Sequence, residues 1–412
     1  MPLIERRYGV WLHADRVGTL NQRGDYTWFT FSDDYLGNAE RAVLGLAFEE
    51  DLHARHSSAL RLPPWFSNLL PEGPLRNWIA HDRAVSPDRE MELLAQVGRD
   101  LPGAVQVLVE DQPPEFLDEL RIGDSSPALS VPEKAAAGWR FSLAGVALKF
   151  SMLKKGDRLV LPAFGQGGDW IVKLPDPLYV DVPRNEHTMM SLAAAAGIEV
   201  PEHVLVPREK LDSLPDEAWR GTETLAYAVK RFDRGERRAL VHIEDLAQVR
   251  NRYAEAKYEG NLETVAALVY RRRDEAALRE FARRVAFNVL VSNGDAHLKN
   301  WSLIYSHPRI PTLSPVYDLV ATGYYKIDDE PEDLGLKFGG TRRFDQVNLG
   351  FFKRLQDRLG ASAADLPGCV VETVDRVASA WPKVAELLEG NQHLQDFVGV
   401  SIDARRRSLL GL

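Results

Sequence analysis

The segment NGDAHLKN, residues 293–300, places one Asp, one His, one Lys and two Asn between two hydrophobic stretches. Upstream, residues 277–292 carry apolar side chains at helical spacings, and downstream WSLIY (301–305) has the composition of a strand. The polar residues therefore lie on a loop between buried elements, where charges are costly unless they are paired or used. A capped turn, in which Asp295 bonds nearby backbone amides, is the alternative interpretation. The segment alone leaves both open.

Asp295 and Asn300 have the spacing found in the catalytic loop of protein kinases. In that loop an Asp accepts the proton of the substrate hydroxyl, and an Asn five positions later binds a magnesium ion. A kinase also needs a second metal-binding Asp further along the chain, and LSPVYDLVATG (313–323) supplies Asp318 between apolar residues. The D-x4-N pattern alone often arises by chance. Together with the later Asp it predicts a magnesium site for phosphoryl transfer.

Phosphate binding requires a cation upstream of this loop. Lys173 lies inside the apolar, strand-like segment DWIVKLP (169–175), where a lysine is costly unless it meets an anion. In kinases a strand lysine at this place pairs with the phosphates and with a glutamate on a helix. Glu186, at the start of the next predicted helix (185–198), is the candidate partner. The alternative is an edge-strand lysine that points to solvent.

Gly145 and His297 also fit a kinase site, but their sequence signals are less specific. Gly145, in SLAGVALK (142–149), could form a turn over the phosphates, although this segment lacks the G-x-G-x-x-G pattern. His297, two residues after the proposed base, lies where many protein kinases carry a lysine that steadies the transferred phosphoryl group. A protonated imidazole could take that part, or the ring could brace the loop by hydrogen bonding, and both roles stay open.

The composition, 45% hydrophobic and 27% charged, is that of an ordinary globular protein. Its single cysteine, Cys369, excludes an intramolecular disulfide and is expected to be a small buried residue in the helical end of the chain. No stretch approaches the ~18 apolar residues of a membrane span, and no apolar signal core follows Met1, so we expect a cytoplasmic protein without membrane contact. The net charge of −9 argues against a surface that covers nucleic acid.

The order of sequence patterns divides the 412 residues into three parts. Residues 1–115 are β-rich, and a connector rich in Pro, Ser and acidic residues (110–134) follows them. Residues 116–240 read as strands with one helix. Residues 241–412 are mainly helical, beginning with a predicted helix at 243–254. The predicted fold class is α+β, with a small sheet lobe joined to a larger helical lobe and a ligand cleft between them.

The segments SLAGVALKF, WIVKLP, VKRFDR, NVLVSNGDAHLKNWSL and LSPVYDLVAT resemble the signature blocks of the HipA family of serine/threonine kinase toxins. NLLPEGPLR and GRDLPGAVQV resemble the N-terminal subdomain of that family, so the resemblance covers nearly the whole chain. It implies a two-lobed protein-kinase-like fold with an extra N-terminal β-rich subdomain. It also implies ATP and Mg²⁺ as cofactors.

The resemblance further implies a biological setting. HipA proteins form type II toxin–antitoxin pairs with HipB, a small helix-turn-helix antitoxin, and would reach DNA only through it. The best-known member phosphorylates glutamyl-tRNA synthetase, which halts translation and produces dormant, drug-tolerant cells. A growth-arrest toxin that targets this synthetase or another translation factor is therefore expected. Two other functions stay open: a small-molecule kinase on a similar scaffold, and a DNA-bound co-repressor module with weak or lost kinase activity.

Individual residues take roles from the resemblance. It makes Asp295 the catalytic base, Asn300 and Asp318 the magnesium ligands, Lys173 the lysine that binds the ATP phosphates, and Lys230, Arg231 and Phe232 the adenine-binding hinge. Ser142 matches a serine that the family autophosphorylates to switch itself off. Two positions depart from the best-known member: Ala147 replaces a polar Gln in the phosphate loop, and Lys230 replaces a hinge Glu.

Overall fold

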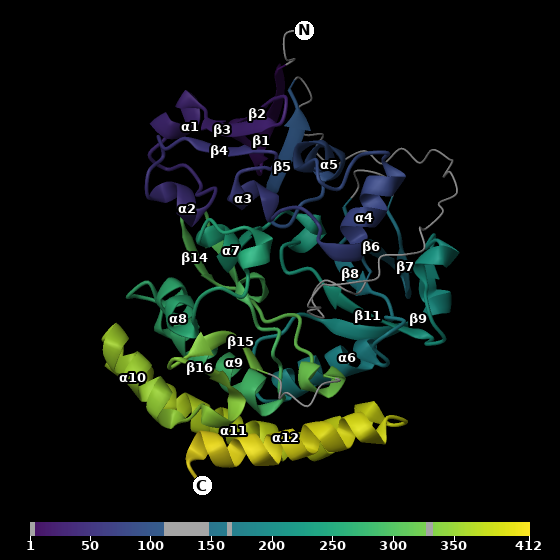
Figure 1. Cartoon of the computed structure of the whole chain (residues 1–412), viewed down its shortest axis with the longest axis vertical. Helices are drawn as coiled ribbons and strands as arrows, with labels where there is room; N and C mark the ends of the chain where they lie inside the picture. The colour runs from purple at the N-terminus through teal and green to yellow at the C-terminus, as the bar shows by residue number, and fades with distance from the viewer. Residues whose placement is uncertain (1–4, 111–147, 163–166, 327–332) are drawn as a thin grey trace.

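Three clusters of buried hydrophobic side chains organise the fold. The computed structural model describes residues 5–110, 148–162, 167–326 and 333–412 (Figure 1). One cluster belongs to an N-terminal domain at the top of Figure 1, one to a six-stranded sheet, and the third and largest joins that sheet to the helical half. The observed mixture of separate sheets and packed helices is the predicted α+β class.

A five-stranded antiparallel sheet of order β4-β3-β2-β1-β5 forms the N-terminal domain. Its strands are β1 (Glu5–Leu12), β2 (Asp15–Arg23), β3 (Tyr26–Phe31), β4 (His56–Ala59) and β5 (Val105–Val109), and its helices are α1 (Asp33–Gly37), α2 (Leu46–Glu49), α3 (Pro64–Ser67), α4 (Gly73–Asp82) and α5 (Glu90–Val97). Gly24, with φ of +62°, permits the tight turn between β2 and β3. The aromatic rings of Phe48, Trp65 and Phe66 are buried against one another beneath this sheet.

A six-stranded sheet of order β10-β7-β6-β8-β11-β9 follows. Its strands are β6 (Lys149–Lys155), β7 (Arg158–Val160), β8 (Trp170–Lys173), β9 (His203–Pro207), β10 (Leu211–Asp212) and β11 (Leu225–Lys230). Helix α6 (Val182–Ala195) packs against β11 and β9 and ends before Gly197, whose φ of +83° suits a helix terminus. The strand at β8 and the helix after it confirm the elements predicted around Lys173 and Glu186.

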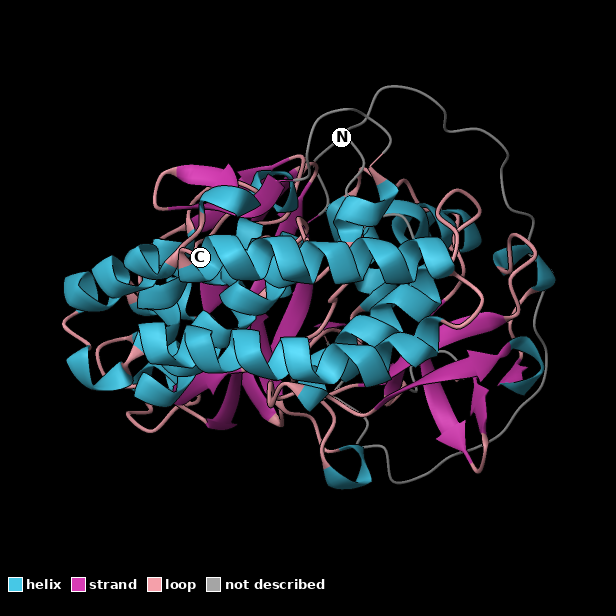
Figure 2. Ribbon diagram, turned by 90° about the horizontal axis from the view of Figure 1, so that it is seen from below, coloured by secondary structure: helices cyan, strands magenta, loops and turns pink. Residues whose placement is uncertain are grey.

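The remaining residues form a mainly helical lobe. Its helices are α7 (Leu246–Val249), α8 (Leu262–Tyr270), α9 (Glu275–Leu290), α10 (Leu349–Leu359), α11 (Leu366–Val384) and α12 (Gln392–Leu410); its strands are β12 (His242–Asp245), β13 (Ser302–His307), β14 (Ile310–Leu313), β15 (Asp333–Phe338) and β16 (Thr341–Arg343). The view from below shows the long helices of the C-terminal end lying across the molecule (Figure 2). Cys369 is buried in α11, as predicted.

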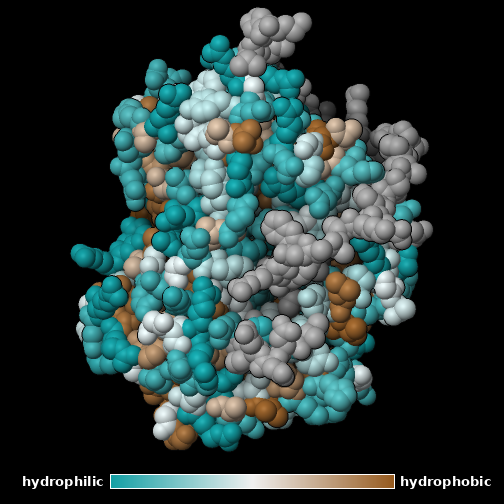
Figure 3. Space-filling model, viewed as in Figure 1, coloured by the Kyte–Doolittle hydropathy of each residue, from teal (hydrophilic) through white to brown (hydrophobic). Residues whose placement is uncertain are grey.

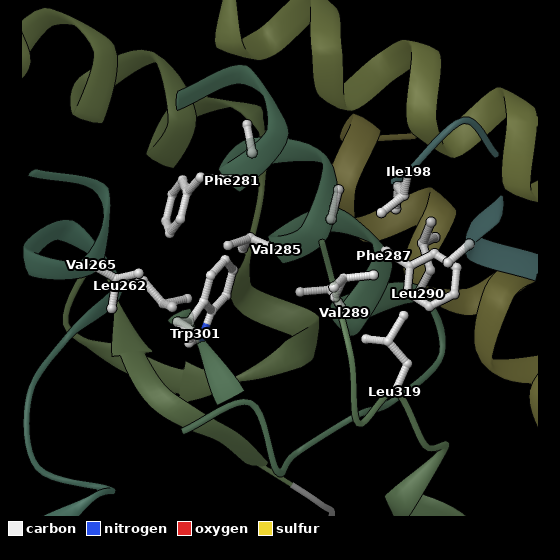
Figure 4. Close-up of a cluster of buried hydrophobic side chains, with 14 of the residues drawn as sticks. Ile198, Leu262, Val265, Phe281, Val285, Phe287, Val289, Leu290, Trp301 and Leu319 are labelled. Carbon is white, nitrogen blue, oxygen red and sulfur yellow. The ribbon is translucent and has the colours of Figure 1, made fainter. Parts of the chain in front are cut away.

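Helix α9 is the centre of this lobe and fixes the loop that follows it. The Asp274 side chain accepts a hydrogen bond from the amide of Ala277 and caps the start of the helix. Phe281 and Val289 are completely buried, and the Phe281 ring packs against Trp301, at the start of the next strand (Figure 4). The segment 293–300 therefore leaves a buried helix and enters a buried strand, as the sequence predicts.

One expectation differs from the structure, and one is not tested by it. The predicted helix at 243–254 is largely absent, because residues His242–Asp245 pair with β13 and only the single turn of α7 follows. Tertiary pairing has overridden local helix propensity there. The predicted domain boundary near residue 115 lies outside the described residues and stays a prediction. Among the described residues, each helix is too short or too polar to cross a membrane, and the face in Figure 3 shows mainly hydrophilic residues with scattered apolar ones.

Candidate active site

All three parts of the fold contribute side chains to one cleft of about 1510 Å³. The described residues that line it include Glu72, Leu75 and Trp78 from the N-terminal domain, Lys149, Lys173 and Phe232 from the sheet lobe, and Asp245, Lys299, Tyr317 and Asp318 from the helical lobe. This volume exceeds that of an ordinary small-molecule pocket. The cleft is therefore large enough for a nucleotide together with part of a second substrate.

Lys173 joins two segments that are far apart in the sequence. It ends β8, and its Nζ lies 2.6 Å from Oε1 of Glu186 in the second turn of α6. The same ammonium group contacts the carboxylate of Asp318, which follows β14. The predicted pairing of Lys173 with Glu186 is thus present, and the solvent-facing alternative is wrong. Asp318 has a φ of +57°, a left-handed conformation that few non-glycine residues adopt.

Charge and burial have opposite effects on the pKa values of Lys173, Glu186 and Asp318. Burial alone would lower the pKa of Lys173, but the carboxylates of Asp318 and Glu186 raise it above its ordinary value. Burial tends to raise the pKa of Asp318, yet Lys173 and Lys149 hold it down to about 2. Burial raises the pKa of Glu186 to about 7, although Lys173 opposes this shift. Lys173 and Asp318 are therefore charged at neutral pH.

Hydrogen bonds within and around the loop 293–300 fix Asp295. Its amide donates to Oδ1 of Asn293 (3.1 Å), and its carbonyl accepts from Nδ2 of Asn300 (2.8 Å). The hydroxyl of Tyr258 donates to the Asp295 carboxylate. The capping role imagined for Asp295 in the turn interpretation is thus filled by the side chain of Asn293.

Asn300 and Asp318 line the same small cavity, beside Asn293 and Tyr317. Because the Asn300 amide nitrogen donates to the Asp295 carbonyl, its amide oxygen is the atom that would face a cation. An amide oxygen and a carboxylate are the hard oxygen ligands that Mg²⁺ prefers, and Mg²⁺ commonly takes only one or two protein ligands beside phosphates. The two residues therefore fit the predicted metal.

The environment of His297 bears on the two roles left open for it. Its ring is buried, and neither ring nitrogen has a hydrogen-bond partner among the described residues. Burial, together with the nearby ammonium group of Lys257, lowers its pKa to about 3. The ring is therefore neutral in this environment, and the phosphoryl-steadying role stays a prediction. The ring packs edge-on against Tyr258 with centroids 5.0 Å apart, so it braces the loop by packing.

The three residues of the predicted adenine hinge differ in what their side chains contact. Phe232 lines the cleft, and its ring lies 5.6 Å from that of Tyr317. Lys230 is half exposed, and its Nζ lies 3.7 Å from the Glu202 carboxylate. The Arg231 guanidinium is committed to Asp100 of the N-terminal domain. The backbone of this hinge remains a candidate for adenine contacts, but the Arg231 side chain binds the domain junction instead.

Ser142, Gly145 and Ala147 lie outside the described residues, so their predicted roles stay predictions. Lys149, the first residue of β6, does line the cleft. Sequence reasoning missed three contributors to the site: Glu72, Lys257 and Tyr258. Glu72 lies in NLLPEGPLR, which had been compared with the family without assigning a role to any residue. The segment around Lys257 and Tyr258 carries no spacing pattern that would have found it.

Family models for the HipA N-terminal domain and the HipA-like C-terminal domain match residues 8–108 and 141–381. The chain belongs to the HipA family. It is 40% identical over 387 residues to "Putative kinase Y4dM" of Sinorhizobium fredii, with 90% of each chain covered. It is 27% identical over 300 residues to the serine/threonine-protein kinase toxin HipA of Shewanella oneidensis, covering 64% of this chain and 66% of that protein.

A solved structure of HipA from Shewanella oneidensis, in complex with HipB and operator DNA, has the same fold. The TM-score is 0.78 at 21% identity, and 98% of each chain is covered. The resemblance inferred from the signature segments is thus confirmed, and so is the two-lobed kinase-like fold with an added N-terminal domain. In this HipA-family chain, Lys173 and Asp318 line the large cleft, Asn300 and Asp318 line the small cavity, and Asn300 is hydrogen-bonded to Asp295.

Proposed function

We propose that this HipA-family protein is an ATP- and Mg²⁺-dependent protein serine/threonine kinase that acts as a growth-arrest toxin. The contact of Lys173 with both Glu186 and Asp318 carries the proposal. It brings the predicted phosphate-binding lysine, its helix partner and a metal-binding carboxylate together at one wall of the cleft.

Each residue then has a task. Asn300 and Asp318 would hold Mg²⁺, which supplies neutralisation of the phosphate charge. Lys173 binds phosphate oxygens, and Glu186 keeps its ammonium group in place. Asp295 accepts the proton of the attacking serine or threonine hydroxyl, and the Tyr258 hydroxyl holds the Asp295 carboxylate in one orientation. Phe232 offers an apolar face to the adenine ring.

The partners follow from family membership. The Shewanella oneidensis protein was solved with HipB and operator DNA, and we propose a HipB-like helix-turn-helix antitoxin for this chain. The net charge of −9 favours DNA contact through that antitoxin. The proposed substrate is glutamyl-tRNA synthetase or another translation factor, in the cytoplasm. Autophosphorylation at Ser142 is proposed as the switch that ends activity, because a phosphate there would add about −1.5 to −2 charges next to the ATP phosphates.

Incubation of the purified protein with labelled ATP and Mg²⁺ tests the kinase assignment. We expect transfer to protein, including to the chain itself at Ser142, and phosphoproteomics after induced expression should identify the target. Transfer only to a metabolite would instead indicate a small-molecule kinase. An absence of any transfer would contradict the proposal.

A DNA-bound co-repressor is the second candidate function, and the HipB–operator complex of the Shewanella protein is the observation that favours it. Gel shifts on the promoter of the chain's own operon distinguish the two roles. We expect weak or no binding by this chain alone and tighter binding with the antitoxin. Tight, sequence-specific binding by the chain alone would favour the DNA-binding function.

A further inference from the structure

The N-terminal domain contacts the active site at Lys299, the residue before Asn300 in the loop 293–300. The Lys299 Nζ donates to the carbonyl (3.2 Å) and to Oδ1 (3.0 Å) of Asn68, and it lies 3.0 Å from Oε1 of Glu72. Asn68 and Glu72 both belong to the N-terminal domain. A further carboxylate, that of Asp245, lies 3.5 Å away in the helical lobe. The side chain of a catalytic-loop residue is thus bound mainly by another domain.

The second oxygen of the Glu72 carboxylate makes an equivalent contact. Oε2 lies 3.1 Å from Nζ of Lys257, and the carbonyl of Lys257 accepts a hydrogen bond from the amide of Leu298 (3.0 Å). The next residue, Tyr258, is the one whose hydroxyl donates to the Asp295 carboxylate. One carboxylate therefore connects two backbone segments, and both lead directly to the catalytic base.

We propose that Glu72 is a positioning residue of the active site, by which the N-terminal domain holds the catalytic loop in its working geometry. The proposal rests on the kinase function given above. Glu72 acts through Lys299 and Lys257 and contacts no reacting atom. It assigns to the N-terminal domain a part in the reaction itself, in addition to any role in assembly.

The charges explain why this carboxylate matters. The Lys257 and Lys299 side chains are only 11% and 13% exposed, and Glu72 lies between their ammonium groups. Burial tends to raise the pKa of Glu72, but the two lysines hold it down to about 2, so it is ionised at neutral pH. Without this charge, two poorly hydrated ammonium groups would repel each other, and both would turn away. Leu298 and Tyr258 would lose their fixed positions with them.

Glu72→Gln in the full-length protein is the test, and Glu255→Gln is its matched control. Glu255 also forms an ion pair across the same domain junction, 2.8 Å from Arg61, but its side chain is 64% exposed and contacts no catalytic-loop residue. Both variants lose one negative charge at the junction. We expect Glu72→Gln to lower kcat by about 10- to 100-fold, because a small displacement of catalytic groups has effects of this size, while KM for ATP changes little. Glu255→Gln should keep wild-type values.

Glu72→Asp should recover part of the lost kcat, since the shorter carboxylate keeps its charge. Hydrogen exchange of residues 293–300 and 257–258 gives a readout that does not depend on activity. We expect faster exchange there in Glu72→Gln than in wild type or Glu255→Gln. If Glu72→Gln melts too low for kinetic measurements, Glu72→Asp takes its place, and hydrogen exchange is measured on that variant.

The outcomes separate the two proposals. If the wild type transfers phosphate and Glu72→Gln matches it in kcat and in exchange, the positioning role is wrong. A loss of kcat equal to that in Glu255→Gln would also overturn it. If the wild type transfers no phosphate, the proposed kinase function fails, while the exchange data still decide whether Glu72 holds the loop.

Discussion

The wall of the cleft contains two buried ion networks that differ in charge balance. In one, the single ammonium group of Lys173 faces two carboxylates, those of Glu186 and Asp318. In the other, the guanidinium groups of Arg231 and Arg234 face the carboxylates of Asp100 and Asp233. The second network is therefore neutral, whereas the first carries one excess negative charge when Glu186 is ionised.

The two networks also differ in their hydrogen bonding. Arg231 and Arg234 also donate to the carbonyls of Leu101 and Gly103, and the Asp233 carboxylate accepts from the amide of Gly103. This network joins the hinge to the N-terminal domain, and its guanidinium groups donate to both carboxylates and backbone carbonyls. The Lys173 group, by contrast, retains carboxylate oxygens that a cation can bind. We infer that the balanced network serves the fold and the unbalanced one serves ligand binding.

The largest effect is expected at Asp295, the proposed base. Asp295→Ala should lower phosphoryl transfer by about 10²- to 10⁴-fold, the usual contribution of a positioned proton acceptor, and abolish toxicity. Asp318→Ala should be similarly inactive. Radiolabel transfer measures this loss, with thermal melting in the absence of nucleotide as the control for folding. Near wild-type transfer by either variant would contradict the kinase assignment.

Next in size is the structural cost of breaking the balanced network. Arg231→Met should lower the free energy of unfolding by about 3–5 kcal/mol, because it leaves Asp233 buried beside a single guanidinium group. Lys173→Met should cost less stability, since Glu186, with a pKa near 7, can take up a proton. Urea titration of both variants compares them. Equal losses would remove the distinction between the networks.

Of the two networks, only the unbalanced one should contribute to the binding of Mg²⁺ and ATP. At ligand concentrations of about 100 times Kd, the complex should gain about 2.7 kcal/mol of stability. Asp318→Ala should lose the part of this gain that requires Mg²⁺, and Asp100→Ala should retain it from a lower starting stability. Melting temperatures with ATP, with and without Mg²⁺, give the answer. A normal Mg²⁺ effect in Asp318→Ala would place the metal elsewhere.

The smallest effect concerns Glu244, a fully buried carboxyl at the domain junction. It accepts hydrogen bonds from Trp65 Nε1 (3.1 Å), the Leu46 amide (3.0 Å) and the Tyr305 hydroxyl (2.5 Å). Burial raises its pKa to about 7. Because this pKa is raised in the folded state, the contribution of Glu244 to stability is greatest at low pH. It should fall by about 1–3 kcal/mol as the pH rises from about 4.5 to 7, and then stay level.

Glu244→Gln should remove this fall while keeping the shape of the side chain. The difference between wild type and variant isolates Glu244 from His242, whose pKa burial lowers to about 4 and which titrates in an overlapping range. Denaturant unfolding at pH 5 and pH 7.5 measures the slope. A slope unchanged by the substitution would show that Glu244 stays ionised throughout.

The parts of the site that could be predicted are those set by local order along the chain. The spacing of Asp295 and Asn300 fixes both on one loop, and a strand followed directly by a helix brings Lys173 to Glu186. Contacts between distant segments had no such signal. Asn68 and Lys299, for example, are 231 positions apart. Nothing near either residue indicates that they meet.

The direction in which a side chain points also could not be predicted from the sequence. The chain position of Arg231 at the hinge was predictable, but its commitment to Asp100 depends on where the N-terminal domain docks. The burial of His297 likewise follows from packing against Tyr258, which no periodicity reveals. The missing helix at 243–254 has the same origin, because pairing with β13 decides the conformation of residues His242–Asp245.

The buried position of Cys369 makes the protein suitable for site-specific labelling. It is the single cysteine of the chain, its side chain is buried in α11, and burial raises the pKa of its thiol, so it should react slowly with maleimides. Cysteines introduced at the exposed positions Leu60 and Val400 could then carry a fluorophore pair without background labelling. The energy transfer between them would report whether the distance between the N-terminal domain and the C-terminal helix α12 changes when ATP is added.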